Sequence, residues 1–200
     1  MQQFTMKLGG HGLVAGVDEA GRGPLAGPVV VAAVILPSQY ELDSLDDSKR
    51  LSALKREQLA PLIEAQAVAY SVEFVEIDEI DRVNILQATL NGMRRAVEKL
   101  EPAPLRVMID GNRAPRLSCE VNTIIGGDRL IPSISAASVL AKVYRDRLMK
   151  SMHLLYPEYG FDRHKGYPTA HHLDRLRALG PCPIHRKSFA PVRRASTPSR

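Results

Sequence analysis

The chain has 200 residues, of which 44% are hydrophobic and 24% charged, enough for one globular domain with a substantial core. Its net charge is +5, no apolar run approaches the roughly 20 residues of a membrane-spanning helix, and residues 1–12 lack the apolar stretch of a signal peptide. Its two cysteines lie far apart and form no paired metal motif. The composition therefore excludes membrane-spanning and disulfide-rich classes and predicts a cytoplasmic protein.

Hydrophobic patterning predicts strands and helices that alternate through most of the chain. In chain order, we expect strands over residues 13–18 and 28–36, a helix over 52–66 capped by Ser52, a strand over 68–75, a helix over 84–100, strands over 105–109 and 121–125, and helices over 133–155 and 169–179. This order predicts one α/β domain, residues 1–194, with a mixed sheet and a basic helical C-terminal portion. Residues 195–200 are expected to form a flexible tail.

Four acidic residues come at or just after the ends of predicted strands: Asp18, Glu19, Asp110 and Asp128. Strand ends in α/β folds bring together catalytic groups from distant parts of a sequence. Carboxylates held close together repel each other unless a cation lies among them, and oxygen ligands without Cys or His favour Mg²⁺ or Mn²⁺. The set predicts a site for two divalent ions that hydrolyses a phosphodiester. The alternative is that each acid caps its own loop or helix.

Other acidic residues have a different context. Asp78, Glu79 and Asp81 come at the start of a predicted helix, where acids favour the helix dipole, and we interpret them as solvated scaffold. Asp46 and Asp47 lie in a loop, where they could flank the site or simply make the turn.

A glycine-rich turn, Gly21-Arg22-Gly23, directly follows two of the predicted ligands. It is not a dinucleotide fingerprint, because a strand rather than a helix comes next. The glycines would let backbone groups approach a substrate closely, and the arginine could meet a phosphate. A purely structural tight turn is the alternative.

The C-terminal section is strongly basic: residues 142–200 hold 13 of the 27 Lys and Arg but only 4 of the 22 Asp and Glu. An acidic N-terminal part and a basic C-terminal part of the sequence suggest a cation site beside a surface that binds a polyanion. A solvated basic tail would give the same charge distribution. Clusters around Tyr167 and Phe189 combine donors with an aromatic, as in nucleic-acid contacts. A zinc site is an alternative whose spacing matches no common pattern; it would use His164, His171, His172 and His185.

In these residues and in the stretches around them, the chain closely resembles ribonuclease HII, the type 2 ribonuclease H family. The resemblance covers roughly residues 13–193. It rests on VAGVDEAGRGPLAGPVVV (14–31), DSKRLS (47–52), NILQAT (84–89), IDGN (109–112), SISAASVLAKVYRD (133–146), YGFDRHKGYPT (159–169) and HRKSFAPV (185–192).

The resemblance implies a ribonuclease H-like fold with a five-stranded mixed sheet, flanking helices and a helical C-terminal portion. It implies hydrolysis of the RNA strand of RNA–DNA hybrids and incision 5′ to single ribonucleotides in duplex DNA, leaving 3′-hydroxyl and 5′-phosphate ends. The metal ligands would be Asp18, Glu19, Asp110 and Asp128. Gly21, Arg22 and Gly23 would read the ribose 2′-hydroxyl, and Tyr167 would stack on the next deoxyribose. Further candidate nucleic-acid contacts are Lys49, Lys142, Arg145, His164, Lys165 and Arg186.

Departures from the family pattern are small. Gly126 stands where members often carry a lysine, which removes one positive charge near Asp128. No glutamine-led peptide with paired aromatics ends the chain, so a sliding-clamp partner is not expected, and nothing requires more than a monomer. The alternatives are a broader two-metal nuclease of the same fold and a hybrid-binding protein without catalysis, although binding alone would not need all four carboxylates.

Overall fold

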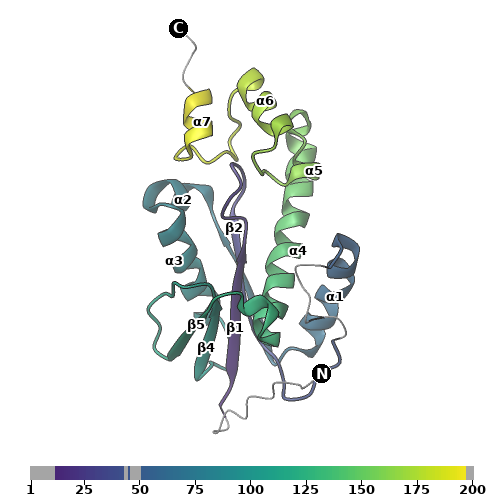
Figure 1. Ribbon diagram of the computed structural model, residues 1–200, viewed down its shortest axis with the longest axis vertical. Coiled ribbons are helices and arrows are strands. Elements are labelled where there is room, and N and C mark those ends of the chain that lie inside the picture. Colours follow the sequence, from purple (N-terminus) through teal and green to yellow (C-terminus); the bar gives the residue numbers. More distant parts are fainter. Residues whose placement is uncertain (1–11, 43–44, 46–50, 197–200) are drawn as a thin grey trace.

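The computed structural model describes residues 12–42, 45 and 51–196, so the predicted contact Lys49 and the loop acids Asp46 and Asp47 lie outside the described residues. At its centre is a five-stranded sheet in the order β3-β2-β1-β4-β5 (Figure 1). The strands are β1 Val14–Ala20, β2 Val29–Ile35, β3 Ala69–Val75, β4 Arg106–Asp110 and β5 Glu120–Ile124. Strand β1 pairs antiparallel with β2 and parallel with β4, which confirms the predicted mixed sheet.

Helices cover both faces of the sheet (Figure 1). They are α1 Ala53–Gln66, α2 Ile77–Val83, α3 Ile85–Glu98, α4 Pro132–Leu155, α5 Phe161–His164, α6 Ala170–Leu179 and α7 Ala190–Ala195, with 3-10 turns η2 Gly127–Arg129 and η3 Pro157–Tyr159. Alternate residues of β2 pack on α3 and on α1 with α4, so the whole strand is buried. None of the helices over the described residues is long and apolar enough to cross a membrane.

Helix α4 lies directly against β1, because Gly16 leaves room for it. A Cβ atom built on Gly16 would lie 2.1 Å from the backbone carbon of Ser133 near the start of α4. No side chain fits at that distance, so a larger residue would push helix and strand apart. This close approach places the first turns of α4 beside the end of β1 that carries Asp18 and Glu19.

Asp78 is exposed, as expected of solvated scaffold, but Glu79 and Asp81 have structural partners. They belong to α2, a separate helix that ends at Asn84, whose φ of 73° turns the chain into α3. Glu79 pairs with Arg95 of α3 at 2.9 Å. The Asp81 carboxylate accepts hydrogen bonds from the backbone N–H groups of residues 187 and 188, both at 2.9 Å. Asp81 therefore fastens the C-terminal portion to α2.

The C-terminal portion packs around the turn between β1 and β2 (Figure 1). The backbone N–H of Leu25 donates to Gly166 O, that of Gly27 to Ile184 O and that of Arg186 to Leu25 O, each at 2.8 Å. Helix α7 runs to Ala195, one residue into the predicted flexible tail, and residues 197–200 lie outside the described residues.

Candidate active site

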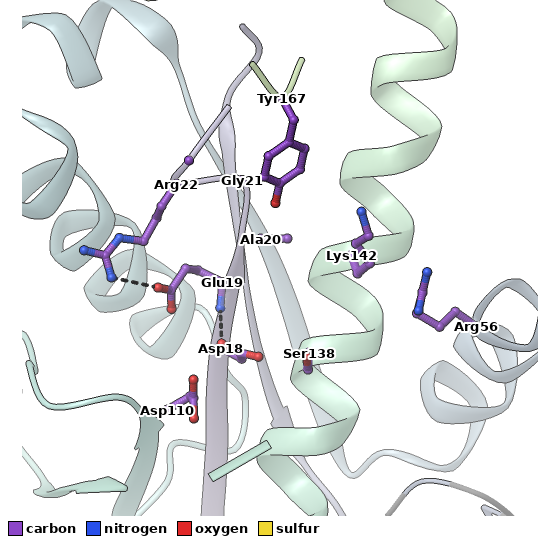
Figure 2. Close-up of a pocket in the computed structure, with 11 residues that line it drawn as sticks. Asp18, Glu19, Ala20, Gly21, Arg22, Arg56, Asp110, Ser138, Lys142 and Tyr167 are labelled. Atoms are coloured by element: carbon purple, nitrogen blue, oxygen red, sulfur yellow. Dashed lines mark hydrogen bonds and ion pairs between the residues drawn. The ribbon is translucent and has the colours of Figure 1, made fainter. Parts of the chain in front are cut away.

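An open pocket of about 440 Å³ lies at the end of β1 (Figure 2). Its walls come from β1, the following turn, β4, α1, α4 and the segment before α6. The residues that line it are Asp18, Glu19, Ala20, Gly21, Arg22, Gly23, Arg56, Asp110, Ser138, Lys142 and Tyr167.

The parallel pairing of β1 and β4 brings three of the predicted ligands to this pocket. Val17 is in register with Ile109, so the residues that follow them, Asp18 and Asp110, come out at the same edge of the sheet. Glu19 follows directly, and Figure 2 shows all three side chains around one space. Asp128 is fully buried in η2, which packs on α4 and β4, and it does not line the pocket.

Burial makes the charges of this site costly. It raises the pKa of Asp18 well above its ordinary value, and the nearby Glu19 charge raises it further, against the opposing effect of a hydrogen bond from Ser138. Burial also raises the pKa of Glu19, although Arg22, 3.1 Å away, acts in the opposite direction. Crowded and desolvated carboxylates of this kind are stabilised by a cation.

The oxygen atoms of the pocket fit a hard divalent cation. The buried atoms Glu19 Oε2 and Asp110 Oδ1 have no hydrogen-bond partner among the described residues. Oxygen ligands of this type suit Mg²⁺ or Mn²⁺. No group of three or more acidic, His or Cys side chains in the described part of the chain is placed so that it could hold a metal ion by itself. Ions held here would therefore need further oxygen ligands from water or substrate, as is usual for Mg²⁺.

The glycine turn and Tyr167 line the pocket beside the carboxylates. A Cβ atom on Gly23 would lie 3.6 Å from Cε1 of Tyr167, so the tyrosine ring faces the turn across ordinary van der Waals distance. Gly21 has a φ of 99°, and a Cβ there would lie 1.9 Å from Nε of Arg145. The turn therefore requires glycine at position 21, while Arg22 stays exposed at the pocket rim.

The structure contradicts a direct nucleic-acid contact for Arg145 and Arg186, because both side chains are fully buried. Arg186 donates to the carbonyl oxygens of residues 21, 22, 24 and 27 at 2.6–3.0 Å. Arg145 donates to Pro28 O, Ala26 O and Lys165 O at 3.0–3.1 Å. Each guanidinium provides hydrogen-bond donors for carbonyl oxygens of the turn between β1 and β2, which lie outside the hydrogen-bond ladder of the sheet. The two arginines hold the turn in place.

The other predicted basic contacts differ in their positions. Lys142 lines the pocket, paired with Asp146 at 2.7 Å. His164 and Lys165 do not line it, and their side chains bond to the backbone of residues 159, 166 and 162. Three pocket residues are additional to the predictions: Ala20 at the end of β1, Arg56 on α1 and Ser138 on α4 (Figure 2). Ser138 belonged to a run of small residues in the sequence; Arg56 carried no signal beyond its charge.

The sequence over residues 15–192 matches the family described as Ribonuclease HII. The chain belongs to the ribonuclease HII family. A ribonuclease HII from Bordetella avium is 60% identical over 180 residues, covering 90% of this chain and 89% of that one. The family assignment confirms the predicted resemblance and makes the chain a ribonuclease H-type hydrolase, in place of the non-catalytic hybrid-binding alternative.

Solved structures of the ribonuclease HII family and its neighbours have the same fold. The ribonuclease H2 of Pyrococcus horikoshii is 26% identical, with a TM-score of 0.79 over 92% of this chain and 97% of that one. Bst-RNase HIII, crystallised with Mn²⁺, is 18% identical, with a TM-score of 0.75 over 92% of this chain and 68% of that one. The predicted ribonuclease H-like fold is confirmed. Ribonuclease HII enzymes cleave RNA within RNA–DNA hybrids and depend on a divalent metal.

The crowding of carboxylates leads to a stability prediction for Asp18→Asn. Because the folded-state pKa of Asp18 lies above its ordinary value, the folded protein binds more protons than the unfolded chain between those two values, and stability falls as pH rises through that interval. At pH 7 and without metal, Asp18→Asn should raise the free energy of unfolding by about 1–2 kcal/mol. The gain should disappear near pH 4. Urea unfolding at both pH values measures it, and a variant less stable than its parent at pH 7 would contradict the crowding.

Proposed function

We propose that this enzyme cleaves the RNA strand of RNA–DNA hybrids and also incises duplex DNA 5′ to a single embedded ribonucleotide, leaving 3′-hydroxyl and 5′-phosphate ends. The observation that carries this proposal is the shared pocket, in which a carboxylate cluster and an accessible glycine turn with a tyrosine lie side by side. The first group provides for hydrolysis, and the second for recognition of one sugar.

Two divalent ions, Mg²⁺ or Mn²⁺, would be held by Asp18, Glu19, Asp110 and Asp128, the first three from the pocket and Asp128 from η2. When bound, such ions supply an activated water and stabilise the leaving oxygen of an in-line displacement. The two buried carboxylate oxygens without a hydrogen-bond partner among the described residues, Glu19 Oε2 and Asp110 Oδ1, support this assignment.

Recognition of the ribonucleotide would come from the glycine turn and Tyr167. At a single position only the 2′-hydroxyl and the sugar shape distinguish RNA from DNA. Gly21 and Gly23 line the pocket beside the carboxylates, the exposed Gly23 has no side chain to cover its backbone, and Arg22 at the rim can meet the adjacent phosphate. Tyr167 is 42% exposed and lines the pocket, which leaves room for stacking on a sugar. Lys142 and Arg56 place positive charge across the pocket, where the strand's phosphates would pass.

The test uses a labelled DNA duplex with one ribonucleotide, incubated with Mg²⁺, Mn²⁺ or neither, beside an all-DNA duplex and a long RNA–DNA hybrid. We expect metal-dependent incision on the 5′ side of the ribonucleotide, cleavage of the hybrid and an intact DNA control. Cleavage of the hybrid alone would refute the single-ribonucleotide activity. It would instead favour the broader nuclease of the same fold.

Tyr167→Ala should reduce incision at a single ribonucleotide by roughly 10–100-fold, because stacking on a nucleotide is worth about 1–3 kcal/mol. The ring is half exposed, so the melting temperature should change little. Tyr167→Phe keeps the ring and serves as the matched control, with near-parent activity. Initial rates on the embedded ribonucleotide and the long hybrid measure the effect. Parent-like incision by the alanine variant would rule out the stacking role.

A further inference from the structure

Two fully buried histidines, His172 of α6 and His185 before α7, lie behind the Tyr167 segment. Their Nε2 atoms are 3.0 Å apart. Neither lines the pocket, and the proposed function assigns them no task. They pack against the ring of Phe161, with ring centroids 5.5 and 5.7 Å away.

The partners of the two rings fix where each proton is. His172 Nδ1 lies 2.9 Å from Tyr167 O, and a carbonyl only accepts, so Nδ1 carries the proton and Nε2 is an acceptor. The backbone N–H of Cys182 donates to His185 Nδ1 at 3.0 Å, so this Nδ1 has a lone pair and Nε2 carries the proton. His185 Nε2–H therefore donates to His172 Nε2. Every donor in the chain of bonds points toward Tyr167.

We propose that His172 and His185 are positioning residues that form a directional hydrogen-bond relay from the Cys182 amide to the Tyr167 carbonyl and so hold the Tyr167 ring over the active site. The inference rests on the proposed role of Tyr167 in reading the ribonucleotide. The specificity of the enzyme then depends on two side chains that touch neither substrate nor metal.

Residues 166 and 167, on which the relay acts, are also held by backbone hydrogen bonds, one of which comes from the turn between β1 and β2. Tyr167 N–H donates to His164 O at 2.9 Å, and Gly166 O accepts from the Leu25 amide at 2.8 Å. Gly166 has a φ of 85°, and a Cβ there would lie 2.7 Å from Ala26 O, so the segment lies flush against the turn. The Tyr167 carbonyl itself accepts two hydrogen bonds, from the Thr169 backbone N–H at 2.8 Å and from His172 Nδ1 at 2.9 Å.

The relay works only with both rings neutral. A further proton on either ring would set two N–H groups face to face, at the His172–His185 contact or at the Cys182 amide. Burial, as the largest cause, lowers the pKa of each histidine to about 4, and the rings of His164 and, for His172, His171 lower it further. The hydrogen bonds of His172 to the backbone of residues 167 and 166 have the opposite effect on its pKa. The relay is therefore intact at neutral pH.

Variants of His172 separate positioning from general stability. His172→Phe keeps the ring volume and removes both bonds, whereas His172→Asn places an amide N–H near the position of Nδ1 and can still donate to Tyr167 O. We expect His172→Phe to lower the ratio of single-ribonucleotide incision to long-hybrid cleavage by about tenfold, the equivalent of one lost hydrogen bond. His172→Asn should restore most of that ratio. His185→Gln, which keeps a donor near Nε2, should behave like His172→Asn.

Two readouts that need no substrate separate this inference from the proposed function. Long-range ¹H–¹⁵N NMR spectra of the parent at pH 7 should show a proton on Nδ1 of His172 and on Nε2 of His185. A nuclear Overhauser contact between the Tyr167 ring and Gly23 should be present in the parent and in His172→Asn, and lost in His172→Phe.

Each outcome either supports or overturns the relay. The relay is supported if both rings have the expected tautomers and the Tyr167–Gly23 contact is lost in His172→Phe and restored in His172→Asn. This holds even if the parent fails to incise single ribonucleotides, because that failure would overturn the proposed function and not the relay. The opposite tautomer on either ring overturns the relay. A Tyr167–Gly23 contact that survives in a folded His172→Phe protein overturns the positioning role, as does an equal loss on both substrates in an enzyme that incises them.

Discussion

Asp110→Asn is expected to reduce hybrid cleavage on the order of 10³-fold or more while leaving the affinity for the hybrid within about threefold of the parent value. The carboxylate ends β4 beside Asp18 and holds a buried oxygen without a hydrogen-bond partner among the described residues. An amide is isosteric but uncharged, so the variant would lose a metal ligand worth several kcal/mol in the transition state, which corresponds to that factor. Single-turnover cleavage in Mg²⁺ and fluorescence anisotropy without metal measure the two quantities.

Asp78→Asn is the matched control, because Asp78 is an exposed acid in the first turn of α2. It should leave both rate and affinity unchanged. Parent-like turnover in Asp110→Asn would remove Asp110 from the proposed ligand set. A fall in affinity as large as the fall in rate would mean that the charge acts on substrate binding rather than on the chemical step.

Arg186→Ala is expected to lower the free energy of unfolding by about 3–5 kcal/mol. The buried guanidinium donates to four carbonyl oxygens of residues 21–27, and its removal would leave them buried and unsatisfied. Arg186→Lys should recover only part of the loss, because an ammonium group has three donors and no planar fork. Urea denaturation at constant pH measures the change as a shift in midpoint.

Arg177→Ala provides the comparison. Arg177 forms an exposed ion pair with Asp174, and its side chain is 71% accessible, so its loss should change stability by less than about 0.5 kcal/mol. If Arg186→Ala were equally mild, Arg145 and the backbone hydrogen bonds would be sufficient to hold the turn. The structural role assigned here to Arg186 would then be wrong.

The elements that sequence patterning predicts best are those with a strong local signal. The Val-rich run of β2, the capped helix α1 and the amphipathic helix α3 all occur close to their predicted bounds. The sequence pattern does not separate helix α2 from α3. The break between them depends on the backbone conformation of Asn84, which hydrophobic periodicity does not predict. Three carboxylates were placed together correctly since parallel strands end at one edge.

Charge alone could not reveal the roles of the basic residues. Lys142, Arg145 and Arg186 belong to the same basic section, yet the first lines the pocket and the other two are fully buried. Whether a guanidinium meets a phosphate or a carbonyl depends on contacts across more than 100 residues of sequence. Arg56 reaches the pocket from α1 through the same kind of long-range packing. Such contacts belong to the tertiary fold and leave no local pattern.

The hydrogen bond from Arg186 to Gly21 O joins residues 165 positions apart, so it can form only late in the synthesis of the chain. Chains grow from the N-terminus, and contacts between distant residues can form only after the later residue has emerged. The sheet and its carboxylates can be complete well before the turn at Gly21 receives its buried guanidinium. The turn proposed to read the ribose therefore takes its final form only after Arg186 has emerged, later than the sheet can form.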